Sequence, residues 1–226
     1  MNVFQRILTA ENLLFMLKGA GCSLLVAIAA LAGGSILALL AAMAKMSKSK
    51  ILRIIANVYV EVIRGTPMML QILILYLCGP VITRTLFHYV FTPNPLVVGT
   101  IAIGINSGAY TSELFRSAIQ SIDKGQWEAA KTIGLNYWQT MKEIILPQAF
   151  KRVLPPYINE FIVLIKDSSL LASIGAVELL HGAQVLGANY YNYMIPLLCA
   201  TVMYLVMTMT ISHFARKLER RLAQSD

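Results

Sequence analysis

Three polar residues with helical spacing lie inside an otherwise apolar stretch of this sequence. Asn106, Tyr110 and Glu113 follow one another at positions i, i+4 and i+7. This spacing places an amide, a phenol and a carboxylate on one side of a helix. Such a polar stripe is expected to face the interior of a helix bundle.

A second polar set has the same character. Asn159 and Lys166 are seven residues apart, and so are Glu160 and Asp167, which aligns an amide, an ammonium group and two carboxylates along one broad helix face. The set offers acceptors for an ammonium group and donors for a carboxylate, as binding of a zwitterionic solute requires. The alternative is a paired polar network that locks two helices together.

A helix-breaking stretch, Gly65-Thr66-Pro67, forms a third candidate site. Pro67 removes a backbone donor and leaves the carbonyl of Ile63 without its helical partner. Irregular backbone at membrane depth is tolerated only where protein or water surrounds it. The stretch is therefore expected either to line a pathway or to form a kink used only for packing. Glu61 and Arg64, three residues apart, are expected to pair with each other at least as readily as to bind a ligand.

The composition indicates that membrane helices position these residues. Of the 226 residues, 57% are hydrophobic and only 13% are charged, which excludes an ordinary soluble domain. The 26 residues between Lys18 and Lys45 are all uncharged, enough for a helix of about 39 Å across a hydrocarbon core of about 30 Å. An ionisable side chain at that depth costs at least ~2.5–3.5 kcal/mol, so a pathway or pairing role is the default hypothesis.

The hydropathy pattern predicts an all-α membrane protein of five transmembrane helices that forms a single domain, residues 1–226. A turn-like stretch is expected from Gly79 to Pro95, and a polar extramembrane loop over about 120–150 is expected to hold two short helical pieces. In the first span, Ala30, Gly34, Ala38 and Ala42 form either a close-packing stripe or a chance pattern in an alanine-rich helix. The five predicted spans are approximately 21–44, 54–77, 96–119, 153–172 and 193–215.

The distribution of basic residues predicts the orientation. In the five-span arrangement, fourteen Lys and Arg residues fall on one side of the membrane and three on the other. Because the side richer in Lys and Arg faces the cytoplasm, the 120–150 loop and the C-terminus are expected there, with the N-terminus outside. The net charge of +8 is thus explained by membrane orientation, and no nucleic acid partner is expected.

A spaced motif in the loop carries a family resemblance. The pattern EAA-x3-G-x9-I-x-LP resembles the signature loop of permease subunits of binding-protein-dependent ABC importers. Arg64-Gly65-Thr66-Pro67, Ile105 to Tyr110 and Asn159-Glu160-Phe161 are similar to the polar amino acid branch, which includes histidine, glutamine and arginine importers. The motif residues are Glu128, Ala129, Ala130, Gly134, Ile144, Leu146 and Pro147.

The resemblance implies a type I importer fold in which this loop couples the permease to an ATPase. Gly134 lacks a Cβ and permits a tight, left-handed turn between two helices, which gives a compact knob. The implied partners are a second permease chain, identical or related, two ATP-binding cassette subunits, an extracytoplasmic amino-acid-binding protein and the bilayer of a bacterial cytoplasmic membrane. The chain has no GxxxxGK[ST] loop, so it is expected not to be an enzyme and to bind no cofactor; ATP and Mg²⁺ belong to the partner.

The resemblance also implies that several polar residues lie near the translocation pathway for a polar amino acid. No catalytic residue and no metal site are expected, since the cysteines and histidines share no ligand spacing. A stand-alone channel or secondary transporter is the other class considered; it explains the polar spans but leaves the loop motif without a purpose. The expected pathway residues are Thr66, Pro67, Asn106, Tyr110, Glu113, Glu160, Lys166 and Asp167.

Overall fold

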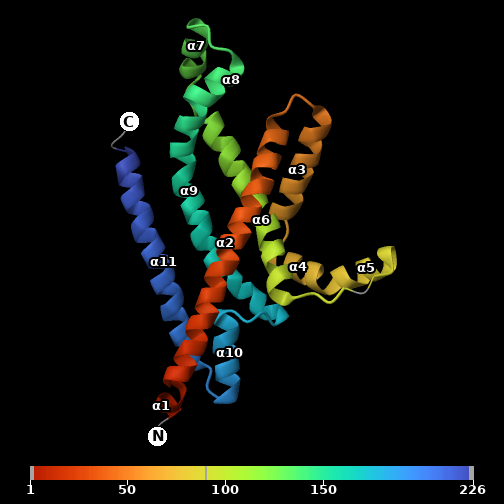
Figure 1. The fold of residues 1–226 in the computed structure, drawn as a ribbon, viewed down its shortest axis with the longest axis vertical. Coiled ribbons are helices and arrows are strands. Elements are labelled where there is room, and N and C mark those ends of the chain that lie inside the picture. The colour runs from red at the N-terminus through yellow and green to blue at the C-terminus, as the bar shows by residue number, and fades with distance from the viewer. Residues whose placement is uncertain (1–2, 90, 224–226) are drawn as a thin grey trace.

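The computed structural model describes residues 3–89 and 91–223, and every regular element within them is helical. After the short α1 (Val3–Ile7), helix α2 (Ala10–Met46) runs the whole length of the bundle (Figure 1). The Thr9 hydroxyl caps α2 by accepting a hydrogen bond of 3.3 Å from the Asn12 amide. The 37 residues of α2 extend about 55 Å and contain the first predicted span.

Helix α6 (Pro95–Gln120) packs against the small residues of α2. A Cβ added to Gly34 would lie 2.8 Å from the carbonyl oxygen of Gly104, so the two backbones meet where neither has a side chain. Ala30, Ala38 and Ala42 are all buried in the same face of α2. The close-packing interpretation of the small-residue stripe is therefore confirmed, and its partner is α6 of the same chain.

The second predicted span, 54–77, is not one helix. Helix α3 (Lys50–Arg64) ends before Gly65-Thr66-Pro67, and α4 (Met68–Leu73) begins after it. A π-helical turn (Ile74–Cys78) then leads into α5 (Gly79–Phe87).

The turn predicted from Gly79 to Pro95 is wrong over its first half, because α5 is helical. Pro80 stands at the start of that helix, directly after the π-helical turn. In Figure 1, α4 and α5 project sideways from the bundle.

The remaining predicted spans correspond to three further helices. The span 96–119 matches α6, and 193–215 lies almost wholly within α11 (Met194–Ala223). The span 153–172 begins inside α9 (Leu146–Asp167) and ends in a 3-10 helix, Ser168–Ile174. By length and composition alone, three segments of the described chain could cross a membrane, Ala10–Met46, Met68–Phe87 and Met194–Arg220. The count of five spans stays a prediction.

The two ends of the bundle carry different elements. Helices α7 (Lys124–Thr132) and α8 (Tyr137–Thr140) lie at the end where α11 finishes, whereas α1 and α10 (Leu179–Asn189) lie at the other end (Figure 1). The two short helical pieces predicted in the 120–150 loop are thus confirmed. Helix α10 was not predicted from the sequence.

Candidate functional site

The bend between α3 and α4 is held by side-chain hydrogen bonds. The Thr66 hydroxyl donates to the carbonyl oxygen of Val62 at 2.8 Å. The carbonyl oxygen of Ile63, which Pro67 deprives of its helical donor, accepts a hydrogen bond of 2.7 Å from Nε2 of Gln71. Thr66 and Pro67 are both exposed. The kink predicted at Pro67 is confirmed, and Gln71 is a member of this site that sequence reasoning missed.

The polar stripe on α6 separates into three environments. Asn106 is only 9% exposed, and its Nδ2 donates to Oε1 of Gln71 at 2.9 Å. Tyr110 is 40% exposed, and the guanidinium carbon of Arg64 lies 5.1 Å from the centre of its ring, within the range of a cation–π interaction. The predicted pairing of Arg64 with Glu61 is wrong: none of the ion pairs among the described residues joins them, because Arg64 faces the Tyr110 ring.

Glu113, the third residue of the stripe, is held by two basic side chains. Its Oε1 pairs with Nζ of Lys45 at the end of α2, and its Oε2 lies 2.7 Å from Nη2 of Arg116 on α6. Both carboxylate oxygens are therefore engaged within the chain. This geometry favours the pairing alternative at Glu113 over binding of a solute.

The α9 residues contact α6 at Ser107, about 100° around the helix axis from Asn106. Ser107 donates a hydrogen bond of 2.9 Å to Oε1 of Glu160. Asp167 is seven residues, or two helical turns, further along α9 from Glu160. Asn159 and Lys166 are exposed, whereas Glu160 and Asp167 are half-buried. The predicted broad polar face therefore has an exposed edge, with Asn159 and Lys166, and a half-buried edge, with Glu160 and Asp167.

The centre of α6 brings the two polar sites together. Neighbouring residues Asn106 and Ser107 contact Gln71 on α4 and Glu160 on α9, respectively. Successive residues of an α-helix point about 100° apart, so one turn of α6 connects both elements. Asn106 has the bend of α3 and α4 on one side and Glu160 on the other. Glu113 lies about 10 Å further along the axis and belongs to a separate charged cluster.

The loop motif forms a compact helical knob. Gly134 has φ +80°, and the amides of Gly134 and Leu135 donate to the carbonyl oxygens of Lys131 and Ala130, both at 3.1 Å. This pair of bonds is a Schellman motif, which ends α7 with a residue in the left-handed region. The left-handed turn predicted at Gly134 is confirmed.

The motif residues divide into those that pack the knob and those that face outward. Ala130 is fully buried, and Ile145, beside Ile144, is the buried centre of a cluster with α6 and α9. A π-helical turn (Met141–Ile145) precedes Leu146 and Pro147, so Pro147 stands at the start of α9, where it breaks no α-helical bond. Outside the packed centre, Glu128, Ala129, Gly134, Leu146 and Pro147 are all exposed.

The outer surface of the knob is aromatic. The rings of Trp127 and Tyr137 stack with centres 6.0 Å apart, and Trp138 meets Tyr137 edge-on at 5.7 Å. Trp138 is 75% exposed. A depression of about 400 Å³ beside the stack is lined by Glu128 and Lys131. Exposed Trp and Tyr side chains are typical of a protein-binding surface.

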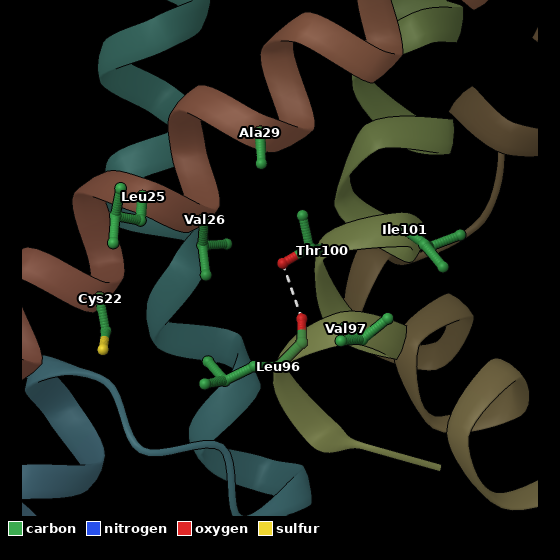
Figure 2. Close-up of a pocket in the computed structure, with 8 residues that line it drawn as sticks. All are labelled: Cys22, Leu25, Val26, Ala29, Leu96, Val97, Thr100 and Ile101. Atoms are coloured by element: carbon green, nitrogen blue, oxygen red, sulfur yellow. Dashed lines mark hydrogen bonds between the residues drawn. The ribbon is translucent and has the colours of Figure 1, made fainter.

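An apolar groove between α2 and α6 is not part of this polar site. The groove has a volume of about 390 Å³, and its only hydroxyl, on Thr100, is bonded to the Leu96 carbonyl oxygen at 2.7 Å (Figure 2). It therefore offers no free polar group to orient a charged solute. Cys22, Leu25, Val26, Ala29, Leu96, Val97, Thr100 and Ile101 line it.

Glu178 is a buried carboxylate that sequence reasoning also missed. It caps α10 by accepting hydrogen bonds from the amides of His181 and Leu180 at 2.7 and 2.9 Å. The hydroxyl groups of Tyr204 and Ser23 donate to its Oε2 at 2.8 and 3.2 Å. Its place directly before the apolar run Leu179-Leu180 is a weak capping signal in the sequence.

The comparisons with known proteins agree with this architecture. Residues 34–224 match the model of the family described as binding-protein-dependent transport system inner membrane component. A putative glutamine transport system permease protein of Rickettsia typhi is 37% identical over 211 residues, covering 93% of this chain and 94% of that protein. The arginine transport system permease protein ArtQ of Bacillus subtilis is 34% identical over 218 residues, covering 96% and 97%.

A solved structure supports the same assignment. The crystal structure of an amino acid ABC transporter with histidines matches with a TM-score of 0.86 and 34% sequence identity, covering 93% of this chain and 95% of that chain. The predicted all-α permease fold and the family resemblance are confirmed.

Proposed function

The chain belongs to the family of binding-protein-dependent transport system inner membrane components, and from that premise we propose that it forms one half of the pathway of an ATP-driven importer of polar amino acids. As a permease component of an amino acid ABC importer it is a transport subunit. The finer assignments are the substrate pathway at the centre of α6 and the coupling role of the knob. One observation supports both assignments. The polar residues Asn106 and Ser107 lie in the middle of α6, whereas α7 and α8 lie at one end of the same bundle (Figure 1).

The proposed pathway lies along the polar centre of α6. Ser107 donates to Oε1 of Glu160, and within residues 3–89 and 91–223 no side chain or amide donates to Oε2, so we assign Oε2 to the ammonium group of the substrate. The exposed ammonium of Lys166 offers the complementary donor for a carboxylate. Thr66, Pro67, Asn106, Tyr110 and Asp167 complete the proposed pathway, and Glu113 would border it through its pairs with Lys45 and Arg116.

The proposed coupling element is the knob of α7 and α8. Trp127 of α7 packs against a buried cluster that includes Ala118 of α6, Ile145 of the π-helical turn and Ala149 of α9. A displacement of the knob would therefore be transmitted to both helices that carry the polar residues. Its exposed side presents Glu128 and Trp138 to an ATPase subunit. Closure of that partner would rock the bundle between inward-open and outward-open states.

The proposed complex has two permease chains, two ATPase subunits and an extracytoplasmic binding protein. ATP and Mg²⁺ would be bound by the ATPase subunits. Because these subunits would dock on the knob from the cytoplasm, the knob and the end of α11 would lie on the cytoplasmic side of a bacterial membrane. The end with α10 would then face outward, toward the binding protein. The basic residues favour this orientation.

A co-purification experiment tests the proposal. The tagged chain is purified from membranes that co-express candidate ATPase subunits, and ATP hydrolysis and amino acid uptake are measured in proteoliposomes. Gly134→Asp is compared with Gly33→Ala, since Gly33 lies inside α2 with open space around it. We expect an ATPase to co-purify with the wild-type chain and Gly33→Ala, and Gly134→Asp to reach the membrane but lose ATP-coupled uptake.

Two outcomes would contradict the proposal. Normal coupled uptake by Gly134→Asp would remove the coupling role from the knob. Solute flux by the chain alone, with no ATPase bound, would instead identify a channel or secondary transporter.

A further inference from the structure

The bend between α3 and α4 leaves backbone carbonyl groups without helical partners. The amide of Gly65 makes the last backbone bond of α3, to Glu61 at 2.8 Å, and the next one begins at Pro67, whose carbonyl oxygen accepts from the Gln71 amide at 3.2 Å. Between these bonds, the carbonyl oxygens of Ile63 and Thr66 must find other donors.

One side chain supplies those donors. Nε2 of Gln71 lies 2.7 Å from the carbonyl oxygen of Ile63, 3.1 Å from that of Thr66 and 2.7 Å from the Thr66 hydroxyl oxygen. Since Gln71 belongs to α4 and Ile63 to α3, the amide group joins the two helices across the bend. A primary amide carries two N–H donors on one atom, so one points toward Ile63 and the other is shared between the two oxygens of Thr66.

The same amide also joins the bend to α6. Its Oε1 accepts the 2.9 Å hydrogen bond from Nδ2 of the buried Asn106. The neighbouring Ile72 is fully buried in the main core, which fixes the base of the Gln71 side chain. Within residues 3–89 and 91–223, no other hydrogen-bonded side chain that the structure shows connects α3, α4 and α6 together.

Packing and hydrogen bonding both act on the projecting arm. Ile72 is fully buried in the main core, and Met68, Leu73, Leu75 and Tyr76 pack against that core while partly buried, whereas most of α5 is exposed. Because apolar packing is non-directional, the hydrogen bonds of Gln71 add the directional constraint on the angle of the bend.

We infer that Gln71 is a positioning residue that holds the Gly65–Pro67 bend in one geometry and orients Asn106 beside it. The inference rests on the proposed function in one respect, that the bend and Asn106 border the substrate pathway. Gln71 affects the substrate only indirectly, by positioning Thr66 and Asn106 through its hydrogen bonds.

Two variants of similar size distinguish the donor function of the Gln71 amide from its acceptor function. Gln71→Leu removes all of its hydrogen bonds, whereas Gln71→Glu keeps an acceptor for Asn106 and loses the donors to Ile63 and Thr66. Met69→Leu is the matched control, because Met69 is on the same helix and exposed.

The first measurement is the geometry of the bend. Spin labels are placed at Val58 and Val81, both exposed on α3 and α5, in a chain without native cysteines. The labelled chain is diluted with unlabelled chain, reconstituted in nanodiscs, and studied by pulsed dipolar spectroscopy. We expect one narrow distance distribution for the wild type and Met69→Leu, and a broadened or shifted one for both Gln71 variants.

The second measurement is transport by the assembled complex. We expect Gln71→Leu to raise the KM for the transported amino acid at least fivefold, with a smaller fall in kcat and a melting temperature close to that of the wild type. Met69→Leu should stay within twofold of the wild-type KM.

An unchanged distance distribution in both Gln71 variants would overturn the inference, and so would a fall in melting temperature as the sole effect. The spectroscopic measurement needs neither ATPase nor substrate, so failure of the import function itself would be recognised separately from failure of this inference.

Discussion

The Ser107 hydroxyl on α6 donates a 2.9 Å hydrogen bond to Oε1 of Glu160 on α9, two residues that are 53 positions apart in the chain. This bond fixes the rotamer of a half-buried carboxylate and leaves its second oxygen available. It also ties the two helices that extend from the polar centre to the knob. Glu160 is therefore oriented by a partner on another helix.

The first prediction concerns Glu160 itself. Glu160→Ala should raise the KM for uptake at least tenfold, which corresponds to about 1.4 kcal/mol, because the ammonium group of the substrate loses its acceptor. Ser107→Ala should raise it about two- to twelvefold, since a single hydrogen bond contributes about 0.5–1.5 kcal/mol. Uptake by the reconstituted complex measures both, with the exposed Glu219→Gln as control. Unchanged kinetics of Glu160→Ala for every amino acid tried would remove Glu160 from the pathway.

The second prediction concerns the charged cluster at Glu113. Because both of its oxygens are engaged by Lys45 and Arg116, Glu113→Gln should lower the melting temperature of the purified chain and leave the KM for uptake within twofold. Lys45→Ala combined with Glu113→Ala should destabilise less than the sum of the single changes, because the two residues interact directly. A large rise in KM at unchanged stability would show that Glu113 binds substrate.

The third prediction concerns the left-handed turn of the knob. A β-branched residue is a poor fit at φ +80°, so Gly134→Val should strain the Schellman motif by at least about 1–2 kcal/mol and weaken ATP-coupled uptake. Gly134→Asn should retain more uptake, since asparagine tolerates the left-handed region. The ratio of uptake to ATP hydrolysis measures the effect. Equal ratios in both variants would mean that the backbone conformation at this position does not matter for coupling.

The fourth prediction concerns the fully buried Glu178. Glu178→Ala leaves the Tyr204 hydroxyl, the Ser23 hydroxyl and two backbone amides without their acceptor, at about 1–3 kcal/mol for each group that stays buried and unpaired. At about 2–4 °C per kcal/mol for a chain of this length, the loss of four partners should lower the melting temperature by at least about 8 °C. Tyr204→Phe, which removes one of these bonds, should lower it by less, and the exposed Glu219→Ala should not lower it. Equal melting temperatures for Glu178→Ala and the wild type would show that α10 is held by apolar packing alone.

Local patterns in the sequence predicted the elements whose cause is local. The uncharged run after Lys18 predicts α2 because only a helix satisfies its backbone in an apolar environment. Gly134 predicts the turn of the knob because a residue without Cβ enters the left-handed region at little cost. Pro67 predicts the bend because the loss of one N–H is a property of the residue itself.

The same local reasoning did not determine which partners the polar side chains find. Lys45 and Glu113 are 68 positions apart, and Gln71 and Asn106 are 35 positions apart, so their contacts depend on how separate helices pack. Glu178 has no polar neighbour in sequence; its partners are two adjacent backbone amides and hydroxyl groups from α2 and α11. Composition and spacing predicted most of the long helices and the residue types they carry, but not α5 or α10. Which of those residues meet depends on how the helices pack, because a hydrogen bond requires two groups within about 3 Å, whatever their separation along the chain.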